Sequence, residues 1–188
     1  MLVLGIDPGL GRTGVAVVGG RAVDLELIYA NTIETVPQTS VTRRLASLLQ
    51  QIEDVIDVYK PDAAAVETLL FSTNRSTAMG VAQARGVILC ALGRRQLDCV
   101  EYSPNQVKEA VAGFGGARKP QVAVMTKKLL GVTSIPGPDD ATDACAVAIC
   151  HHHRARIGVS VSAVSQSKPL PTLKAAIEAA MLRQGAKR

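Results

Sequence analysis

Leu2-Val3-Leu4-Gly5-Ile6-Asp7-Pro8-Gly9, followed by Thr13-Gly14-Val15-Ala16-Val17-Val18, is the stretch that decides the fold of this chain. Residues 2–6 form a continuous apolar run, which is typical of a strand covered on both faces. The prolines and glycines after it mark a tight turn, and residues 13–18 return as a second strand. Because the connection is too short for a crossover helix, we expect these two strands to pair antiparallel.

The rest of the chain alternates between strand and helix patterns. We expect a third strand over residues 23–33, a helix over 37–59, a strand over 63–67 parallel to the first, and helix in the later part of 72–95. A fifth strand is expected over 97–102, and helices over 104–113, from about 120 to 130, and over 138–153. This order predicts an α/β fold with a mixed five-stranded sheet flanked by helices. Residues 1–157 form the predicted domain, and residues 158–188 a flexible tail with a possible short helix over 172–184.

Composition indicates one globular domain with a basic surface. Of the 188 residues, 47% are hydrophobic and 20% are charged. No apolar run approaches the ~18 residues that cross a bilayer, and no basic segment precedes the first strand, so we expect a cytoplasmic protein without a signal peptide. Lys and Arg outnumber Asp and Glu by 21 to 16, and this excess suits a polyanionic partner.

The cysteines show no Cys-x-x-Cys spacing. We expect Cys90, Cys99, Cys145 and Cys150 to be reduced thiols in apolar surroundings. A zinc site formed by Cys145, Cys150 and the histidines at 151–153 is an alternative. It is not favoured, because four ligands converge poorly from one continuous helix.

Two apolar runs each end on a carboxylate. Asp7 ends the first strand and Glu67 the fourth, and an unpaired buried carboxylate is costly. If these strands are adjacent and parallel, both acids lie at the sheet edge where α/β proteins tend to bind ligands. A turn acid is the simpler explanation for Asp7, and a solvated strand end for Glu67. Glu101 also ends an apolar strand, but we rank it lower because Lys108 could pair with it.

A further pair of acids, Asp140 and Asp143, lies at the start of an apolar helix. Their spacing of three residues places them on one face of that helix. An acid in a first helical turn commonly complements the helix dipole, which is the simpler explanation for Asp140. Asp143 is followed by an apolar segment, Ala144-Cys145-Ala146-Val147-Ala148-Ile149, so it needs a partner.

A divalent metal ion is the economical partner for such a set of acids. Ligands that offer only oxygen favour Mg²⁺, with Mn²⁺ possible, over zinc. Two such ions about 4 Å apart can activate a water and stabilise the leaving oxygen of a phosphodiester. We therefore expect the catalytic and metal-binding residues to be Asp7, Glu67, Asp140 and Asp143.

Several of these residues belong to a set of motifs that resembles a known family. Gly5-Ile6-Asp7-Pro8-Gly9, Glu67, Gln83-Ala84-Arg85-Gly86, Glu101-Tyr102 with Val107-Lys108, and Asp140-Ala141-Thr142-Asp143 resemble the RuvC family of bacterial Holliday-junction resolvases. The resemblance extends from residue 1 to about residue 153. It implies an RNase H-like fold, a homodimer, and Mg²⁺-dependent paired nicks in two opposed strands of a four-way DNA junction during recombination and repair. It also implies the four acids above as catalytic residues, and the branch-migration complex of RuvA and RuvB as a partner.

The same resemblance suggests residues that contact DNA. Lys108 and Lys119 match basic residues that the family uses for DNA contact or catalysis. Where the family often has an aromatic residue this chain has Leu70, so a stacking role passes to the next residue, Phe71. Arg118 and Lys119 lie on a glycine-rich loop that could follow a phosphate backbone. Other basic residues that could contact phosphates, although a solvated surface is the default for each, are Arg12, Arg75, Arg85, Lys127 and Lys128.

Two other functions compete with this one. Asp7-Pro8-Gly9 with Thr13-Gly14 resembles the first phosphate loop of actin-like ATPases and sugar kinases, but those proteins need a second lobe, for which 188 residues leave little room. A junction-binding scaffold without catalysis is the other alternative. The complete set of acids argues against a scaffold.

Overall fold

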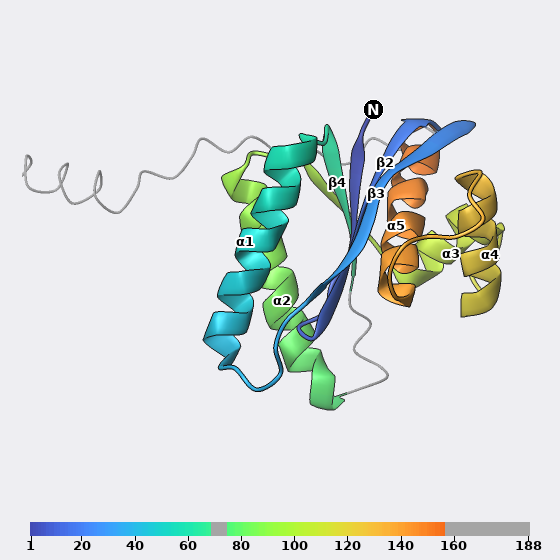
Figure 1. Ribbon diagram of the computed structural model, residues 1–188. Helices are drawn as coiled ribbons and strands as arrows, with labels where there is room; N and C mark the ends of the chain where they lie inside the picture. The colour runs from blue at the N-terminus through green and yellow to red at the C-terminus, as the bar shows by residue number, and fades with distance from the viewer. Residues whose placement is uncertain (69–74, 157–188) are drawn as a thin grey trace, which may run out of the picture.

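The protein is a five-stranded sheet covered by helices on both faces (Figure 1). The computed structural model describes residues 1–68 and 75–156. Its elements are β1 (Val3–Asp7), β2 (Arg12–Arg21), β3 (Asp24–Glu34), α1 (Val41–Tyr59), β4 (Ala63–Glu67), α2 (Arg75–Arg94), β5 (Cys99–Tyr102), α3 (Pro104–Ala112), α4 (Lys119–Leu129) and α5 (Asp139–Arg156). This architecture confirms the predicted α/β fold. The tail at 158–188 lies outside the described residues.

The sheet has the strand order β3-β2-β1-β4-β5. β1 pairs antiparallel with β2 and parallel with β4, as the sequence predicts. β1 is therefore central, and its residues Val3, Leu4 and Ile6 are fully buried. The carboxyl ends of β1 and β4 meet at one edge of the sheet, which places Asp7 and Glu67 together.

Alternating side chains of the sheet enter two separate cores. On one face, Leu4, Ile6 and Val17 pack with residues of α1 and α2. On the other, Val3, Ala16 and Val18 pack with α5, while α3 and α4 cover the outer side of α5 (Figure 1). The helix α5 is thus enclosed between the sheet and two other helices.

Glycines bring α5 unusually close to the sheet. A Cβ atom added at Gly5 of β1 would overlap the backbone of Ala144 and Ala148 in α5, and one added at Gly14 of β2 would overlap the backbone of Asp140. Backbones can pack this closely only where side chains are minimal. The two glycines therefore fix how near the start of α5 lies to the end of β1.

Capping residues set two helix starts. The predicted start of the first helix at residue 37 is wrong, because the side chain of Ser40 accepts a hydrogen bond from the backbone N–H of Arg43 and caps the helix there. The start at Pro104 is confirmed, with Ser103 and Gln106 forming a reciprocal capping box.

The three histidines at the end of α5 bind neighbouring elements. His151 Nδ1 lies 3.1 Å from the hydroxyl of Tyr102 in β5, and His152 Nε2 lies 3.0 Å from the carbonyl oxygen of Val18 in β2. His153 Nδ1 lies 2.9 Å from the carbonyl oxygen of Ala110 in α3. These contacts join α5 to its surroundings and leave the zinc alternative without support.

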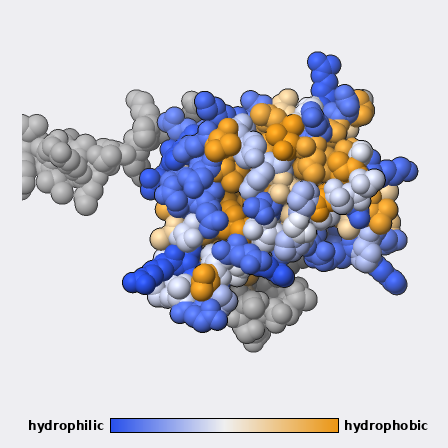
Figure 2. Space-filling model, viewed as in Figure 1, coloured by the Kyte–Doolittle hydropathy of each residue, from blue (hydrophilic) through white to orange (hydrophobic). Residues whose placement is uncertain are grey.

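The surface has a polar region and an apolar region, and one cysteine is exposed. Polar side chains predominate over α1, and apolar ones gather over the β2–β3 side of the face in Figure 2. All four cysteines are free, but Cys90 is exposed on α2, so the prediction of apolar surroundings is wrong for that one residue. Within the described ranges, no helix is both long and apolar enough to span a membrane.

Because α5 lies so close to β1, replacing glycine by alanine should change stability in opposite directions at Gly5 and at Gly93. Gly5→Ala should lower the free energy of unfolding by about 1–3 kcal/mol or more, because the new methyl group forces α5 away from β1. Gly93→Ala is the matched control, since a Cβ there meets nothing within 4 Å, and alanine should raise helix stability by up to about 1 kcal/mol. Urea unfolding measures both changes. Equal effects at the two positions would contradict the close-packing explanation.

Candidate active site

Four carboxylates converge at the carboxyl edge of the sheet. Asp7 is the last residue of β1 and Glu67 the last of β4, and the parallel register pairs Ile6 with Val66 directly before them. Asp140 and Asp143 lie in the first turns of α5. The proximity of Gly14 to the backbone of Asp140 brings that end of α5 against the strands. The structure therefore brings together the four acids that the sequence singles out.

The acids change one another's protonation. Burial, and next the charges of Glu67, Asp143 and Asp140, raise the pKa of Asp7 well above its ordinary value. Burial and the charge of Asp143 raise the pKa of Glu67 to about 7, although a hydrogen bond with Asp7 opposes this shift. A hydrogen bond between two carboxyl groups requires a proton on one of them. Burial and mutual repulsion thus both favour the protonated forms of Asp7 and Glu67.

Two cations neutralise the other two acids. Nε of Arg12 lies 3.2 Å from Oδ2 of Asp140, and Nζ of Lys119 lies 2.8 Å from Oδ2 of Asp143. This ion pair with Asp143 raises the pKa of Lys119. Oδ2 of Asp140 is buried, yet no hydrogen bond to it is found among the described residues, so its contact with Arg12 is electrostatic only. Asp143, for which the sequence demands a partner, has one in Lys119.

The four carboxylates suit a hard divalent cation, but their oxygens must come closer together to hold one. All four groups offer carboxylate oxygens, the ligands that Mg²⁺ and Mn²⁺ prefer, and the unbonded oxygen of Asp140 is a ready donor. In the part of the chain that the structure describes, no three acidic, histidine or cysteine side chains already form a ligand cluster. Asp140 and Asp143 instead pair with Arg12 and Lys119, and a metal ion would replace these cations.

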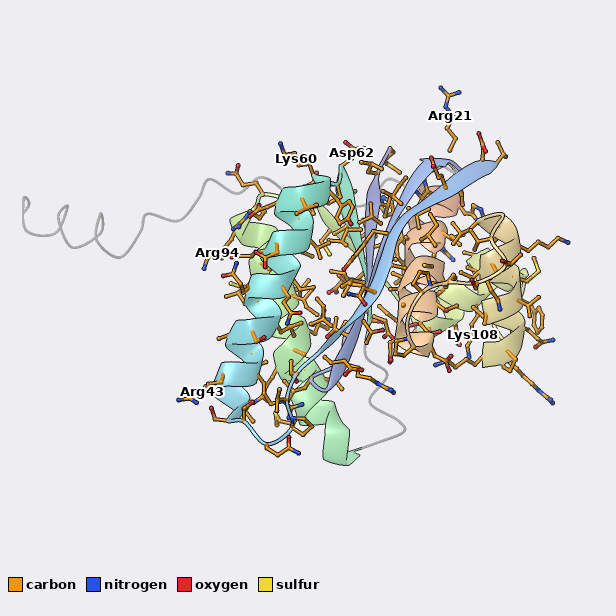
Figure 3. The ribbon with its side chains drawn as sticks, in the orientation of Figure 1. Arg21, Arg43, Lys60, Asp62, Arg94 and Lys108 are labelled. Atoms are coloured by element: carbon orange, nitrogen blue, oxygen red, sulfur yellow. The ribbon has the colours of Figure 1, made fainter. Side chains whose placement is uncertain are left out.

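A hollow of about 260 Å³ opens beside Glu67 and Asp143. Lys108 and Lys119 line it together with apolar residues of α3, α4 and α5, and Lys108 lies near the start of α5 in Figure 3. Both ammonium groups lower the pKa of Glu67, in opposition to its burial. The predicted basic residues Lys108 and Lys119 therefore adjoin the acids.

The structure does not bring the remaining residues that are predicted to contact DNA next to the acids, and one of them lies outside the described residues. Arg85 forms an ion pair with Glu101, so the expected pairing of Lys108 with Glu101 is wrong. Arg118 is exposed at the start of α4. Arg75 begins α2, and Phe71 lies outside the described residues. A role of each in DNA contact stays a prediction.

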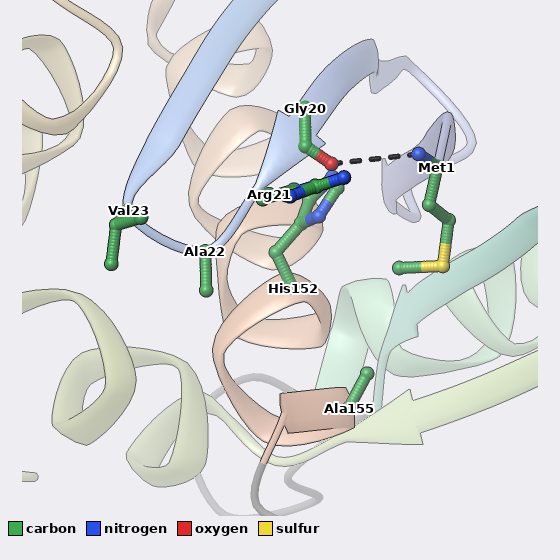
Figure 4. A pocket seen from close by; sticks show the side chains of 7 residues that line it. All are labelled: Met1, Gly20, Arg21, Ala22, Val23, His152 and Ala155. Carbon is green, nitrogen blue, oxygen red and sulfur yellow. Dashed lines mark hydrogen bonds between the residues drawn. The ribbon is translucent and has the colours of Figure 1, made fainter.

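A second hollow lies at the opposite end of the sheet and is remote from the acids. It has about 410 Å³ and is lined mainly by the β2–β3 turn and the end of α5, including Val23, His152 and Ala155 (Figure 4). The amino group of Met1 lies 3.5 Å from the carbonyl oxygen of Gly20 at its rim. None of the described residues that line it carries a carboxylate, and it does not belong to the acid site.

Comparison with known proteins gives the family. A sequence profile described as "Crossover junction endodeoxyribonuclease RuvC" matches residues 3–151. The chain belongs to the RuvC family. A RuvC from Natranaerobius thermophilus is 40% identical over 157 residues, covering 84% of this chain and 98% of that protein. A RuvC from Moorella thermoacetica is 46% identical over 151 residues, covering 80% and 90%.

Solved structures agree with this family. The structure described as T. thermophilus RuvC in complex with Holliday junction substrate superposes with a TM-score of 0.79 at 34% identity, covering 84% of this chain and 96% of that one. The yeast mitochondrial Holliday junction resolvase Ydc2 superposes with a TM-score of 0.57 at 12% identity and shares the fold. The RuvC-family chain thus has the RNase H-like fold that the sequence motifs imply.

One residue of the site was not ranked by sequence reasoning. Arg12 begins β2 after a glycine-containing turn and looks like any solvated turn residue, with a side chain that is 59% exposed. Its position beside Asp140 depends on how α5 packs on β2, which no local pattern reveals. The antiparallel pairing of Asp7 with Gly14 was the available signal, because it returns residue 12 toward the end of β1.

The raised pKa of Glu67 predicts how the stability of the metal-free protein depends on pH. Folding raises this pKa from 4.5 to about 7, so the folded state holds a proton that the unfolded state releases. The contribution of Glu67 to the free energy of unfolding should therefore be highest below pH 4.5 and fall as pH rises toward 7. Glu67→Gln should remove that fall, with a gain on the order of 3 kcal/mol at pH 8 and little gain at pH 4.5.

Chemical unfolding in EDTA at a series of pH values measures this effect. Glu26→Gln, on an exposed part of β3, is the control for the loss of one carboxylate. If the free energy of unfolding of Glu67→Gln depends on pH in the same way as that of the wild type, Glu67 does not take up a proton on folding.

Proposed function

We propose that this RuvC-family chain is a structure-selective endonuclease that resolves Holliday junctions by nicking two opposed strands. The observation that carries the proposal is the set of four converging carboxylates, whose burial and mutual repulsion raise the pKa of Asp7 and Glu67. A divalent cation would stabilise such a set, because its charge offsets the repulsion. The relatives named as crossover junction endodeoxyribonucleases and the junction complex of T. thermophilus RuvC support the substrate.

The family's nucleases are metal-dependent; for this chain we propose Mg²⁺, two ions per site, held by Asp7, Glu67, Asp140 and Asp143. When bound, the metal supplies an activated water and stabilises the leaving oxygen of the phosphodiester. The burial of Asp7 and Glu67 keeps bulk water away from these charges and strengthens their interactions.

The basic residues around the acids would position the phosphate. Lys119 is 57% exposed and contacts Asp143, so its ammonium group can leave that carboxylate and approach a phosphate oxygen. Lys108 lines the same hollow on the Glu67 side. Positive groups placed next to a phosphorus centre stabilise the charge that develops on its oxygens.

Cutting two opposed strands requires two acid sets. The described part of one chain carries one such set, which supports a homodimer as the acting form. The partners RuvA and RuvB stay predictions from the family resemblance, and a cytoplasmic location stays a prediction from the sequence. The actin-like alternative loses its basis, because its phosphate loop is explained by the β1–β2 turn of the RuvC family.

The decisive experiment separates cleavage from binding. Asp143→Asn should reduce nicking of a synthetic four-way junction in Mg²⁺ by more than about 100-fold, since even the partners of metal ligands cost 10–100-fold. Junction binding should survive, because the basic residues remain. Asp139→Asn, a neighbouring carboxylate that is 86% exposed, should nick at nearly the wild-type rate.

Electrophoresis of end-labelled junctions measures cleavage, and fluorescence anisotropy measures binding. If the wild type binds the junction but produces no nick in Mg²⁺ or Mn²⁺, the protein is a scaffold and the proposed catalysis is wrong. Equal loss of binding and cleavage in Asp143→Asn would instead indicate a folding defect.

Metal binding should also be visible without any substrate. Mg²⁺ at ten times its dissociation constant should stabilise the wild type by about 1.4 kcal/mol, and EDTA should reverse the shift in melting temperature. Asp143→Asn should show a much smaller shift, whereas Asp139→Asn should keep the full one. A shift of the same size in Asp143→Asn would place the metal elsewhere.

A further inference from the structure

A third hollow adjoins the acids on the side opposite to Lys108 and Lys119. It has about 440 Å³ and is lined by Gly9, Leu10, Gly11, Arg12, Arg44, Gly80, Val81 and Asp140. Asp140 is thus the acid that faces this hollow, while Glu67 and Asp143 face the one with the lysines. The four acids lie between two hollows, and among the described residues two basic ones line each hollow.

Arg44 fixes the wall of this hollow. Its Nε donates to Thr35 Oγ1 at 2.8 Å, and its Nη2 donates to the carbonyl oxygen of Leu10 at 3.2 Å. The backbone N–H of Thr35 donates to the carbonyl oxygen of Gly11 at 3.0 Å. These bonds hold the carbonyl group of Leu10 against Arg44 and that of Gly11 against Thr35. Among the described residues, no partner is found for the backbone N–H of Leu10 or Gly11.

Arg12 contributes the mobile charge. Only its Nε approaches Asp140, and the contact lacks hydrogen-bond geometry. Its remaining guanidinium N–H groups make no hydrogen bond within residues 1–68 and 75–156. A guanidinium offers two parallel donors that match two oxygens of a phosphate. The side chain is 59% exposed, so it can turn from Asp140 into the hollow at little cost.

We propose that this hollow binds a backbone phosphate of the strand being cut, next to the phosphate that lies at the acids. The proposal rests on the nuclease function above and assigns its ligand class, a nucleic-acid phosphodiester. Arg12 and Arg44 supply the charge. The backbone N–H groups of Leu10 and Gly11 supply further donors, as in other phosphate-binding turns. Cations on both sides of the acids then hold the strand across the metal site. Arg12 also neutralises Asp140 while no strand is bound.

Arg12→Gln tests the assignment, and Arg21→Gln is the matched control. Arg21 ends the same strand β2 at the opposite end of the sheet (Figure 3), so both variants lose one positive charge. In EDTA, where a metal-dependent nuclease leaves the junction intact, Arg12→Gln should bind about 5- to 10-fold more weakly and lower the salt slope by about 1. Arg12→Lys should lose less than Arg12→Gln, and Arg21→Gln should match the wild type. Thermal unfolding checks that Arg12→Gln keeps the wild-type fold.

Replacing single backbone phosphates of the junction by uncharged methylphosphonates identifies the phosphate that the hollow binds. Single methylphosphonates are placed at each of the three phosphates on either side of the nick. At one of these positions the wild type should lose as much affinity as Arg12→Gln does on the unmodified junction, and Arg12→Gln should lose nothing further. The hollow is not a phosphate site if Arg12→Gln binds the junction with wild-type affinity. It is not one either if, at every position, the loss from the methylphosphonate multiplies the loss from Arg12→Gln. In both cases the nuclease function stands if the wild type nicks the junction. A wild type that neither binds nor nicks the junction overturns both proposals.

Discussion

The mutual repulsion of four carboxylates at one sheet edge is the constraint on which the rest of this structure depends. Each acid ends or begins an element whose other residues build the core, so none can move away without disturbing that core. The repulsion is offset in two ways in the metal-free protein. Burial and repulsion raise the pKa of Asp7 and Glu67 and so favour their neutral forms, while Arg12 and Lys119 neutralise Asp140 and Asp143.

The packing of α5 links fold and site directly. Gly5 and Gly14 let the backbone of α5 approach two strands, and the same approach brings Asp140 and Asp143 to the strand ends. The buried residues of α5 lie in one of the two cores, and its histidines bind three neighbouring elements. Since interiors are close-packed and resist small shifts, the acids are held by the helix as a whole. Larger residues at the glycines would both strain the core and separate the acids.

Sequence reasoning succeeded where the signal was local or periodic. The apolar runs before Asp7 and Glu67 predicted two strands, and parallel pairing then predicted that their ends meet. Asp143 was recognised because its apolar helix demanded a partner. That Lys119 supplies the partner was not predicted, because the pairing depends on how α4 packs beside α5, and no spacing in the chain encodes this contact.

The errors have the same origin. Glu101 was expected to pair with Lys108, which is near in sequence, but Arg85 of α2 reaches it and Lys108 turns toward Glu67. Arg12 was treated as one of many solvated cations for the same reason. Side-chain pairs between distant elements depend on the final packing, whereas strands and helices follow from short patterns. The four acids could be named from the chain, but their counter-ions could not.

A cluster of acids repels a polyanion, and the counter-ions resolve this difficulty. Arg12 and Lys119 are more than half exposed, so their ion pairs with Asp140 and Asp143 are weak and easily exchanged. A divalent cation held by the four acids would take over the neutralisation and release both side chains. Each released cation already borders a hollow beside the acids. Metal binding would therefore remove negative charge from the centre and present positive charge on both flanks in one exchange, which would strengthen the binding of a phosphate backbone.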